Sequence, residues 1–184
     1  MISLLGLLAT LGFSIVYAVS IYNALIKKRA MAEESFSGVD VQLKRRADLI
    51  PNLVETVKGY MTHESGTLEK VTAMRARAQN ASSSDERFQA ESQISSLLGN
   101  IMAVSENYPD LKASTNFTNL QNELSELEEQ IQLSRRYYNG TARDLNIMID
   151  QFPTNIIAGF GGFQKKDYFE IENASDREVQ KVSF

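Results

Sequence analysis

The sequence predicts an all-α protein, in which one N-terminal transmembrane helix is followed by an antiparallel, up-and-down helical bundle. Three observations predict this fold class. The first 26 residues carry no charged side chain. Apolar residues recur at helical spacing through most of residues 31–152. Glycine and proline, which interrupt helices, are scarce between residues 27 and 150.

The uncharged segment at residues 1–26 is long enough to cross a bilayer. A hydrocarbon core about 30 Å thick needs about 20 apolar residues in helical form, and only a helix satisfies every backbone N–H within one segment. The alternative is a cleaved signal peptide, but no basic residue precedes the apolar run and Ala18-Val19-Ser20 is a poor cleavage site. We therefore expect a permanent anchor that contacts the lipid bilayer through residues 2–26.

Cations follow the anchor and none precedes it. They are Lys27, Lys28, Arg29, Lys44, Arg45 and Arg46. Because the flank richer in lysine and arginine stays in the cytoplasm, we expect a single-pass membrane protein with its N-terminus outside and its bulk in the cytoplasm.

The remaining ~158 residues are enough for one domain with its own hydrophobic core. Their composition disfavours several classes of function. The net charge of −4 disfavours general nucleic-acid binding, which needs a basic face. Cysteine is absent and His63 is the one histidine. The His63-Glu64 pair lacks the second histidine, four residues on, that a zinc protease needs. We expect no cofactor, no metal site and no enzymatic activity.

A first helical pattern covers residues 31–78, with Pro51 inside it. Its apolar positions are Ala32, Phe36, Val39, Leu43, Ile50, Leu53, Val57, Tyr60, Leu68, Val71, Met74 and Ala78. Arg46 stands where this stripe requires an apolar residue. Pro51 cannot donate to the carbonyl of Ala47. Both a kinked, continuous helix and a tight reversal with Pro51 opening a new helix fit the pattern.

Two further helices are predicted. Ser83 and Glu86 have the spacing of a capping box and predict a helix start, and Pro109 ends that helix because it disfavours helical geometry at Tyr108. A heptad pattern then runs from Ser114–Asn116 to just before Pro153. Its positions are Phe117, Leu120, Leu124, Leu127, Ile131, Ser134, Tyr138, Thr141, Leu145, Met148 and Phe152.

The C-terminal segment differs from the rest of the chain. Residues 156–163 are apolar and, by propensity, too rich in glycine for a stable helix. Either Phe160 and Phe163 cap the bundle, or they insert at the headgroup level while Lys165 and Lys166 meet anionic lipid. We expect the chain from Glu170 onward to be disordered. The predicted organisation is a transmembrane helix at 1–26, a bundle at 27–152 and a tail at 153–184.

Short loops favour packing of the helices within one chain. The heptad pattern also permits pairing between chains as a coiled coil, so a homo-oligomer is the alternative. The sequence names no protein partner.

Two polar clusters are candidate interaction sites. Paired arginines beside aromatic residues suit carboxylate or phosphate recognition and protein contacts. If Pro51 and Pro109 mark bends at one level of the bundle, the first patch comprises Arg45, Arg46, Asp48, Asn52, Glu106, Asn107 and Tyr108. The second comprises Arg135, Arg136 and Tyr138. The competing interpretation is salt bridging within the bundle, to residues such as Glu106 or Asp110.

Several long motifs in order resemble the LemA family. They are VQLKRRADLIPNLVETVKGY at residues 41–60 with His63-Glu64, ENYPDLKA at 106–113, RRYYN at 135–139, Gly162-Phe163, and Tyr22-Asn23 in the anchor. The resemblance implies a bacterial inner-membrane protein with a cytoplasmic four-helix bundle, which favours a break at Pro51. It implies no established activity, and nothing singles out the family's magnetosome-associated branch.

Two functions follow as hypotheses. The first is a non-catalytic, membrane-anchored protein-interaction module, suggested by the anchor, the heptad pattern and the poor catalytic inventory. The second is a membrane-shaping or self-assembling scaffold that uses the C-terminal tail at the lipid surface.

Overall fold

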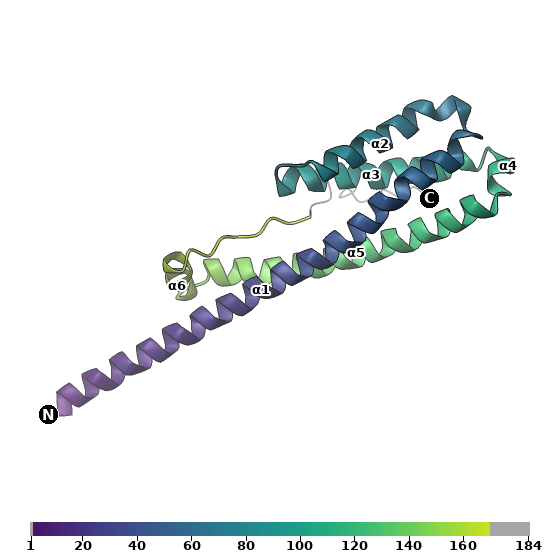
Figure 1. Ribbon diagram of the computed structural model, residues 1–184. Coiled ribbons are helices and arrows are strands. Elements are labelled where there is room, and N and C mark those ends of the chain that lie inside the picture. Colours follow the sequence, from purple (N-terminus) through teal and green to yellow (C-terminus); the bar gives the residue numbers. More distant parts are fainter. Residues whose placement is uncertain (1, 170–184) are drawn as a thin grey trace, which may run out of the picture. The chain divides into compact units, whose positions relative to one another are not determined.

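The computed structural model describes residues 2–169, which are helical up to Phe160 apart from short connections and then continue to residue 169 without regular secondary structure (Figure 1). The elements are α1 (Ile2–Lys58), the 3-10 helix η1 (Thr62–Glu64), α2 (Ser65–Gln79), α3 (Ser84–Ser105), α4 (Pro109–Lys112), α5 (Thr115–Asp150) and α6 (Thr154–Phe160). No strand occurs within residues 2–169. The all-α prediction is confirmed.

The described residues divide into two compact units. The first contains residues 2–38 and 134–168, and the second contains residues 39–133 and 169. Both α1 and α5 supply residues to each unit.

The second unit is built on the packing of α2 against α3, with parts of α1 and α5. Its buried apolar residues are Ile50, Leu53, Val57, Met61, Leu68, Val71, Ala78, Ala90, Ile94, Leu98, Ile101, Leu111, Phe117 and Leu124. Ser83 caps α3 as predicted, because its hydroxyl accepts a hydrogen bond from the Glu86 N–H at 3.2 Å. The Glu86 carboxylate accepts from the backbone N–H of Ser82 rather than of Ser83, and this bond lowers the pKa of Glu86.

The break expected at Pro51 from the family resemblance is wrong, because α1 continues through Pro51 to Lys58. The chain reverses instead at Gly59–Met61, where Met61 N–H still bonds the carbonyl of Val57. Glycine disfavours helix by about 1 kcal/mol relative to alanine, so the helix ends readily at Gly59. It does not end at Pro51, because the hydrogen bond that Pro51 removes is replaced. The replacement comes from α2: Arg75 Nε donates to the Ala47 carbonyl at 2.6 Å.

The first unit packs α1 against α5 and α6. Leu25, Ala32, Leu145, Ala158 and Phe163 form its buried core. Polar contacts join α1 to α5 along the same face. Ser35 and Thr141 share a hydrogen bond of 2.7 Å, and Lys28 donates to Asp144 at 2.9 Å. The hydrogen bond from Lys28 lowers the pKa of Asp144.

A short helix, α6, forms where the glycine content had predicted none, so that expectation is wrong. Its C-terminus explains why. Phe163 N–H bonds the Ala158 carbonyl and Gly162 N–H bonds the Gly159 carbonyl, with Gly162 at φ 66°. This is a Schellman motif, which satisfies the last carbonyls of a helix and requires a left-handed residue that glycine adopts freely. The glycines therefore terminate the helix rather than prevent it.

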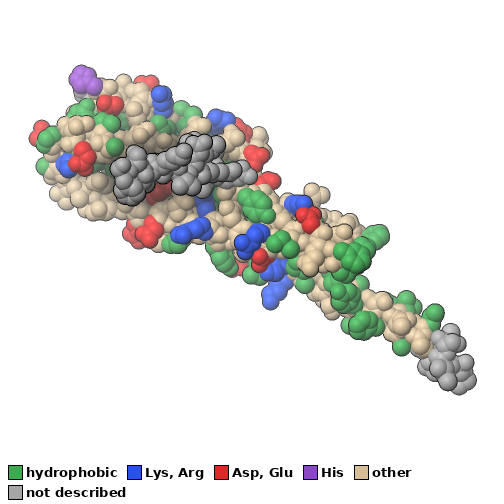
Figure 2. All heavy atoms as spheres, turned by 180° about the vertical axis from the view of Figure 1, so that it is seen from behind, with side chains coloured by type: hydrophobic (Ala, Val, Ile, Leu, Met, Phe, Trp, Pro, Cys, Tyr) green, Lys and Arg blue, Asp and Glu red, His purple; other side chains and the backbone are tan. Residues whose placement is uncertain are grey.

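The N-terminal part of α1 is long and apolar enough, by length and composition, to cross a membrane. Its large side chains are exposed in this structure; Leu7, Phe13 and Val16 are 65, 73 and 66% exposed. Figure 2 shows hydrophobic side chains and no charged ones on this stretch. The predicted disorder from Glu170 onward lies outside the described residues.

Candidate functional site: the Arg46 cluster and the exposed face of α1

Arg46 occupies a core position of α1. It lies one turn from Leu43 and Ile50 on the buried face of the helix, and it is 1% exposed. A charged side chain at such depth requires paired charges and hydrogen bonds to offset the loss of water. The surrounding helices supply both.

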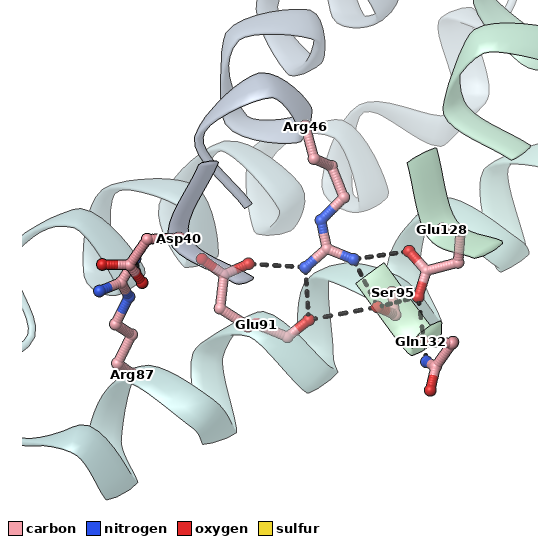
Figure 3. Close-up of polar contacts among 7 residues, drawn as sticks. All are labelled: Asp40, Arg46, Arg87, Glu91, Ser95, Glu128 and Gln132. Carbon is pink, nitrogen blue, oxygen red and sulfur yellow. Dashed lines mark hydrogen bonds and ion pairs between the residues drawn. The ribbon is translucent and has the colours of Figure 1, made fainter. Parts of the chain in front are cut away.

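Glu91 and Ser95 of α3 and Glu128 of α5 surround the guanidinium (Figure 3). Arg46 Nη2 donates to the Glu91 carboxylate at 2.6 Å and to the Glu91 backbone carbonyl at 2.9 Å. Arg46 Nη1 donates to Ser95 Oγ and to Glu128 Oε2, each at 2.6 Å. Ser95 Oγ in turn donates to the other oxygen of Glu128 at 2.8 Å. We call these four residues the Arg46 cluster.

The Arg46 cluster is a brace between three helices. Glu91 neutralises Arg46 in the interior, since their side chains are 8 and 1% exposed, whereas the Glu128 side chain is 32% exposed and meets solvent. Both terminal nitrogens of Arg46 already donate to internal acceptors. Nε is buried without a hydrogen-bond partner among the described residues. An external anion would have to displace these contacts, so the cluster acts in packing rather than as an open binding site.

A second ion pair lies beside the cluster. Arg87 Nη2 is 2.9 Å from Asp40 Oδ1, close enough for an ion pair although the atoms are not aligned for a hydrogen bond (Figure 3). A groove of about 310 Å³ adjoins it, lined by Leu43, Lys44, Ala47, Ala78, Gln79, Ala81, Arg87 and Glu91. The small alanine side chains leave this surface open.

Three members of the first predicted patch share the exposed face of α1. Arg45, Asp48 and Asn52 are exposed and follow one another at spacings of three and four. Two of them make local contacts along α1: Arg45 donates to Gln42 at 3.3 Å, and the Asp48 carboxylate lies 3.5 Å from the Lys44 ammonium. These side chains therefore face solvent beside the buried Arg46.

The other members of that patch lie elsewhere in the second unit. Arg45 precedes the end of α1 by 13 residues, about 20 Å along a helix, whereas α4 and the residues before it lie at the end where α1 reverses (Figure 1). Pro51 lies inside α1, seven residues before its end, whereas Pro109 is the first residue of α4. Glu106 pairs with Lys112, Asn107 is exposed and Tyr108 packs against the core.

The second predicted patch is divided between core and surface. Tyr138 is 4% exposed, contacts the Phe36 ring at 5.3 Å and donates its hydroxyl to the Asp167 carbonyl at 2.8 Å. Burial raises the pKa of Tyr138 to about 12. Arg136 is exposed and lines an open hollow with Asn139, Gly140, Arg143 and Tyr168, and Arg135 is half-buried.

A family model decides the classification. The LemA family model matches residues 35–184, which is most of the chain and includes the Arg46 cluster. The chain belongs to the LemA family.

Individual relatives agree with this LemA assignment. Protein LemA of Metamycoplasma hominis is 28% identical over 180 residues, which are 97% of this chain and 80% of the relative. Magnetosome protein MamQ 2 of Paramagnetospirillum magneticum is 25% identical, over 86% of this chain and 68% of the relative. Magnetosome protein MamQ of Magnetospirillum gryphiswaldense is 24% identical over the same shares.

Sequence reasoning found Arg46 in this LemA protein but missed its partners. The salt-bridge interpretation named Glu106 or Asp110, whereas the structure pairs Arg46 with Glu91 and Glu128. A signal for Glu91 was present, because it interrupts the stripe Phe88–Ile94–Leu98 just as Arg46 interrupts Leu43–Ile50. Two opposite charges, each at an apolar position of its own helix, indicate a buried pair. No comparable signal separates Glu128 from its exposed neighbours.

Proposed function

We propose that the protein is a membrane-anchored, non-catalytic interaction module, and that a partner protein binds the exposed face of α1. We define the α1 stripe as Val41, Arg45, Asp48 and Asn52. All four are exposed, and they are spaced by four, three and four residues, so they form one continuous line on the helix. Val41 is 58% exposed and gives the line an apolar contact point.

One observation carries the proposal: of two adjacent arginines on α1, Arg46 is buried and Arg45 is exposed. Arg46 turns inward and is held by Glu91, Ser95 and Glu128. That brace fixes the rotation of α1, so Arg45 is held outward with Asp48 and Asn52. A rigid helix face with mixed charge and an apolar point suits a helical or loop segment of another protein.

The anchor and its orientation belong to the same proposal. Residues 6–20 of α1 are exposed apart from the half-buried Ala18, as lipid contact requires, and Lys27, Lys28 and Arg29 follow the uncharged stretch directly. We infer a single-pass protein of the bacterial inner membrane, with the N-terminus outside and the second unit in the cytoplasm. Tethering confines the α1 stripe to the membrane surface, which raises its effective concentration toward membrane-bound partners.

Co-purification from native membranes tests the module. The full chain with Arg45→Ala and Asp48→Ala is compared with the unchanged chain after mild crosslinking. The matched control carries Glu126→Ala and Glu129→Ala on the exposed face of α5. Arg46 stays intact in every variant, so the brace is not disturbed. We expect specific proteins that are lost with the α1 variant and kept with the control. Equal recovery from both variants would exclude the α1 stripe.

A membrane-shaping or self-assembling scaffold is the second candidate function. One observation favours it: Ile156 and Phe160 of α6 are 49 and 91% exposed. Electron microscopy of vesicles that carry the full chain, with and without Phe160→Ser, separates the scaffold from the interaction module. Tubes or constrictions that depend on Phe160 support the scaffold, and unchanged vesicle shape at high protein density rules it out.

A further inference from the structure

The first unit exposes large apolar side chains at one end of α5 and on α6. Phe152 is 75% exposed, Ile156 49% and Phe160 91%. Ile156 and Phe160 are four residues apart on α6 and so share one face. Exposed apolar residues that share a helix face mark an interaction surface more often than isolated ones do. We call Ile156 and Phe160, together with Phe152 in the turn before α6, the α6 patch.

Contacts within the first unit place α6 beside the C-terminal end of the predicted anchor. Phe163, three residues after the end of α6, contacts the Tyr22 ring at a centroid distance of 5.7 Å. Arg29 lies over the same Phe163 ring at 5.3 Å. Ile21 and Leu25 pack in one core with Ala158 of α6. The α6 patch therefore belongs to the level of α1 where its apolar run meets its first charges, Lys27 and Lys28.

Charge on the first unit is complementary to a lipid surface. Its described residues include eight lysines and arginines against five aspartates and glutamates, although the whole chain has a net charge of −4. Lys165 and Lys166 follow α6, and Lys165 is 56% exposed beside Asp150 at 2.7 Å. Amphipathic segments at the bilayer interface combine apolar side chains with nearby cations in this way.

We propose that the α6 patch lies in the headgroup layer of the same bilayer that holds α1, as a second membrane contact. This inference rests on the proposed anchor. The occupant is lipid because α6, through Ala158 and the following Phe163, packs against Tyr22 and Leu25 in the segment that would enter the membrane. Two contacts fix the tilt and rotation of α1 at the interface, which a single spanning helix leaves free.

Tryptophan fluorescence tests the proposal, since the chain contains no tryptophan. Three single-tryptophan variants of the full chain are reconstituted in vesicles of phosphatidylcholine and phosphatidylglycerol. Phe160→Trp reports the α6 patch, and Phe13→Trp reports the anchor. Tyr137→Trp is the control, because Tyr137 is 62% exposed on α5 and precedes Asp150 by 13 residues, about 20 Å along the helix. Lipids brominated near the headgroup and lipids brominated deep in the chain serve as quenchers.

The expected result separates the three positions. The tryptophan of Phe160→Trp should emit at a shorter wavelength in vesicles than free tryptophan does in buffer. Bromine near the headgroup should quench it more than bromine deep in the lipid chain. Phe13→Trp should be quenched more by deep bromine, and Tyr137→Trp by neither. Circular dichroism confirms that each variant stays helical.

Each other outcome contradicts a different statement. If Phe13→Trp is quenched and Phe160→Trp behaves like Tyr137→Trp, the anchor stands and the α6 contact is wrong. If neither Phe13→Trp nor Phe160→Trp is quenched, the anchor itself is wrong. If Phe160→Trp is shielded from aqueous iodide yet unquenched by brominated lipid, protein covers the α6 patch, either a second copy or another chain, and lipid does not.

Discussion

Arg75 Nε donates to the backbone carbonyl of Ala47 at 2.6 Å. That carbonyl is the one that loses its helical donor, because Pro51 stands four residues later and has no N–H. The guanidinium of Arg75, on α2, thus replaces the backbone hydrogen bond that Pro51 removes from α1. A helix that would otherwise kink or end runs on for two more turns and buries Leu53 and Val57.

Removing Arg75 should therefore cost stability in a way that depends on Pro51. Arg75→Met leaves the Ala47 carbonyl without its charged donor, and we expect the free energy of unfolding to fall by about 1.5–3 kcal/mol. In a Pro51→Ala background, the new N–H bonds Ala47 itself, so Arg75→Met should cost about 1 kcal/mol or less. Chemical denaturation of the full chain in detergent measures all four proteins. Equal costs in the two backgrounds would show that Arg75 acts independently of Pro51.

The Arg46 cluster predicts that replacing Arg46 strongly destabilises the protein, whereas replacing its neighbour Arg45 does not. Arg46→Ala leaves Glu91 buried and unpaired and should cost about 3–5 kcal/mol. Arg45→Ala, on the exposed side of the same turn, should change stability by about 0.5 kcal/mol or less. Replacing both Arg46 and Glu91 by leucine should recover much of the loss, because it removes both buried charges. A small effect of Arg46→Ala would mean that the brace does not hold the helices.

Tyr138 predicts a loss of stability at high pH. Burial favours the neutral phenol and raises its pKa from 10.0 to about 12, so the unfolded chain releases this proton first. Stability from this group is full below pH 10 and falls as pH rises towards 12. Tyr138→Phe should weaken that decline, whereas Tyr137→Phe, at an exposed position, should not. Denaturation midpoints between pH 9 and pH 11 provide the comparison, and identical slopes for the two variants would contradict the assignment.

Orientation is testable because the sequence has no cysteine. Asp48→Cys places one thiol on the exposed face of α1, and a membrane-impermeant maleimide should label it only after the cells are broken. Lys70→Cys on α2 serves as a second cytoplasmic position. Labelling of either position in intact spheroplasts would reverse the proposed topology.

Local periodicity was enough to predict most of the helices. The heptad residues Phe117, Leu124 and Ile131 are buried as expected, and α5 ends just before Pro153. Ser83 starts α3 as its spacing with Glu86 predicted. These features depend on residues within a few turns of one another, which is the range over which a sequence pattern carries information.

The errors arose where distant residues decide the outcome. Pro51 stays helical because of Arg75, which is 24 positions away in the sequence. Arg46 is buried because Glu91 and Glu128 converge on it from two other helices. The grouping of the first candidate patch likewise depends on how distant residues are arranged, since it assumed that Pro51 and Pro109 mark bends at the same level.

Contact at the α1 stripe is measured most directly by photo-crosslinking in living cells. A photoreactive amino acid is placed at one position at a time: Val41, Arg45, Asp48 or Asn52. Glu126 on α5 is the control position outside the α1 stripe. The proposal predicts one shared crosslinked partner from the four α1 positions and none from Glu126. Crosslinks with equal yield from Glu126, or none from the α1 positions, would contradict an interaction module that uses this face.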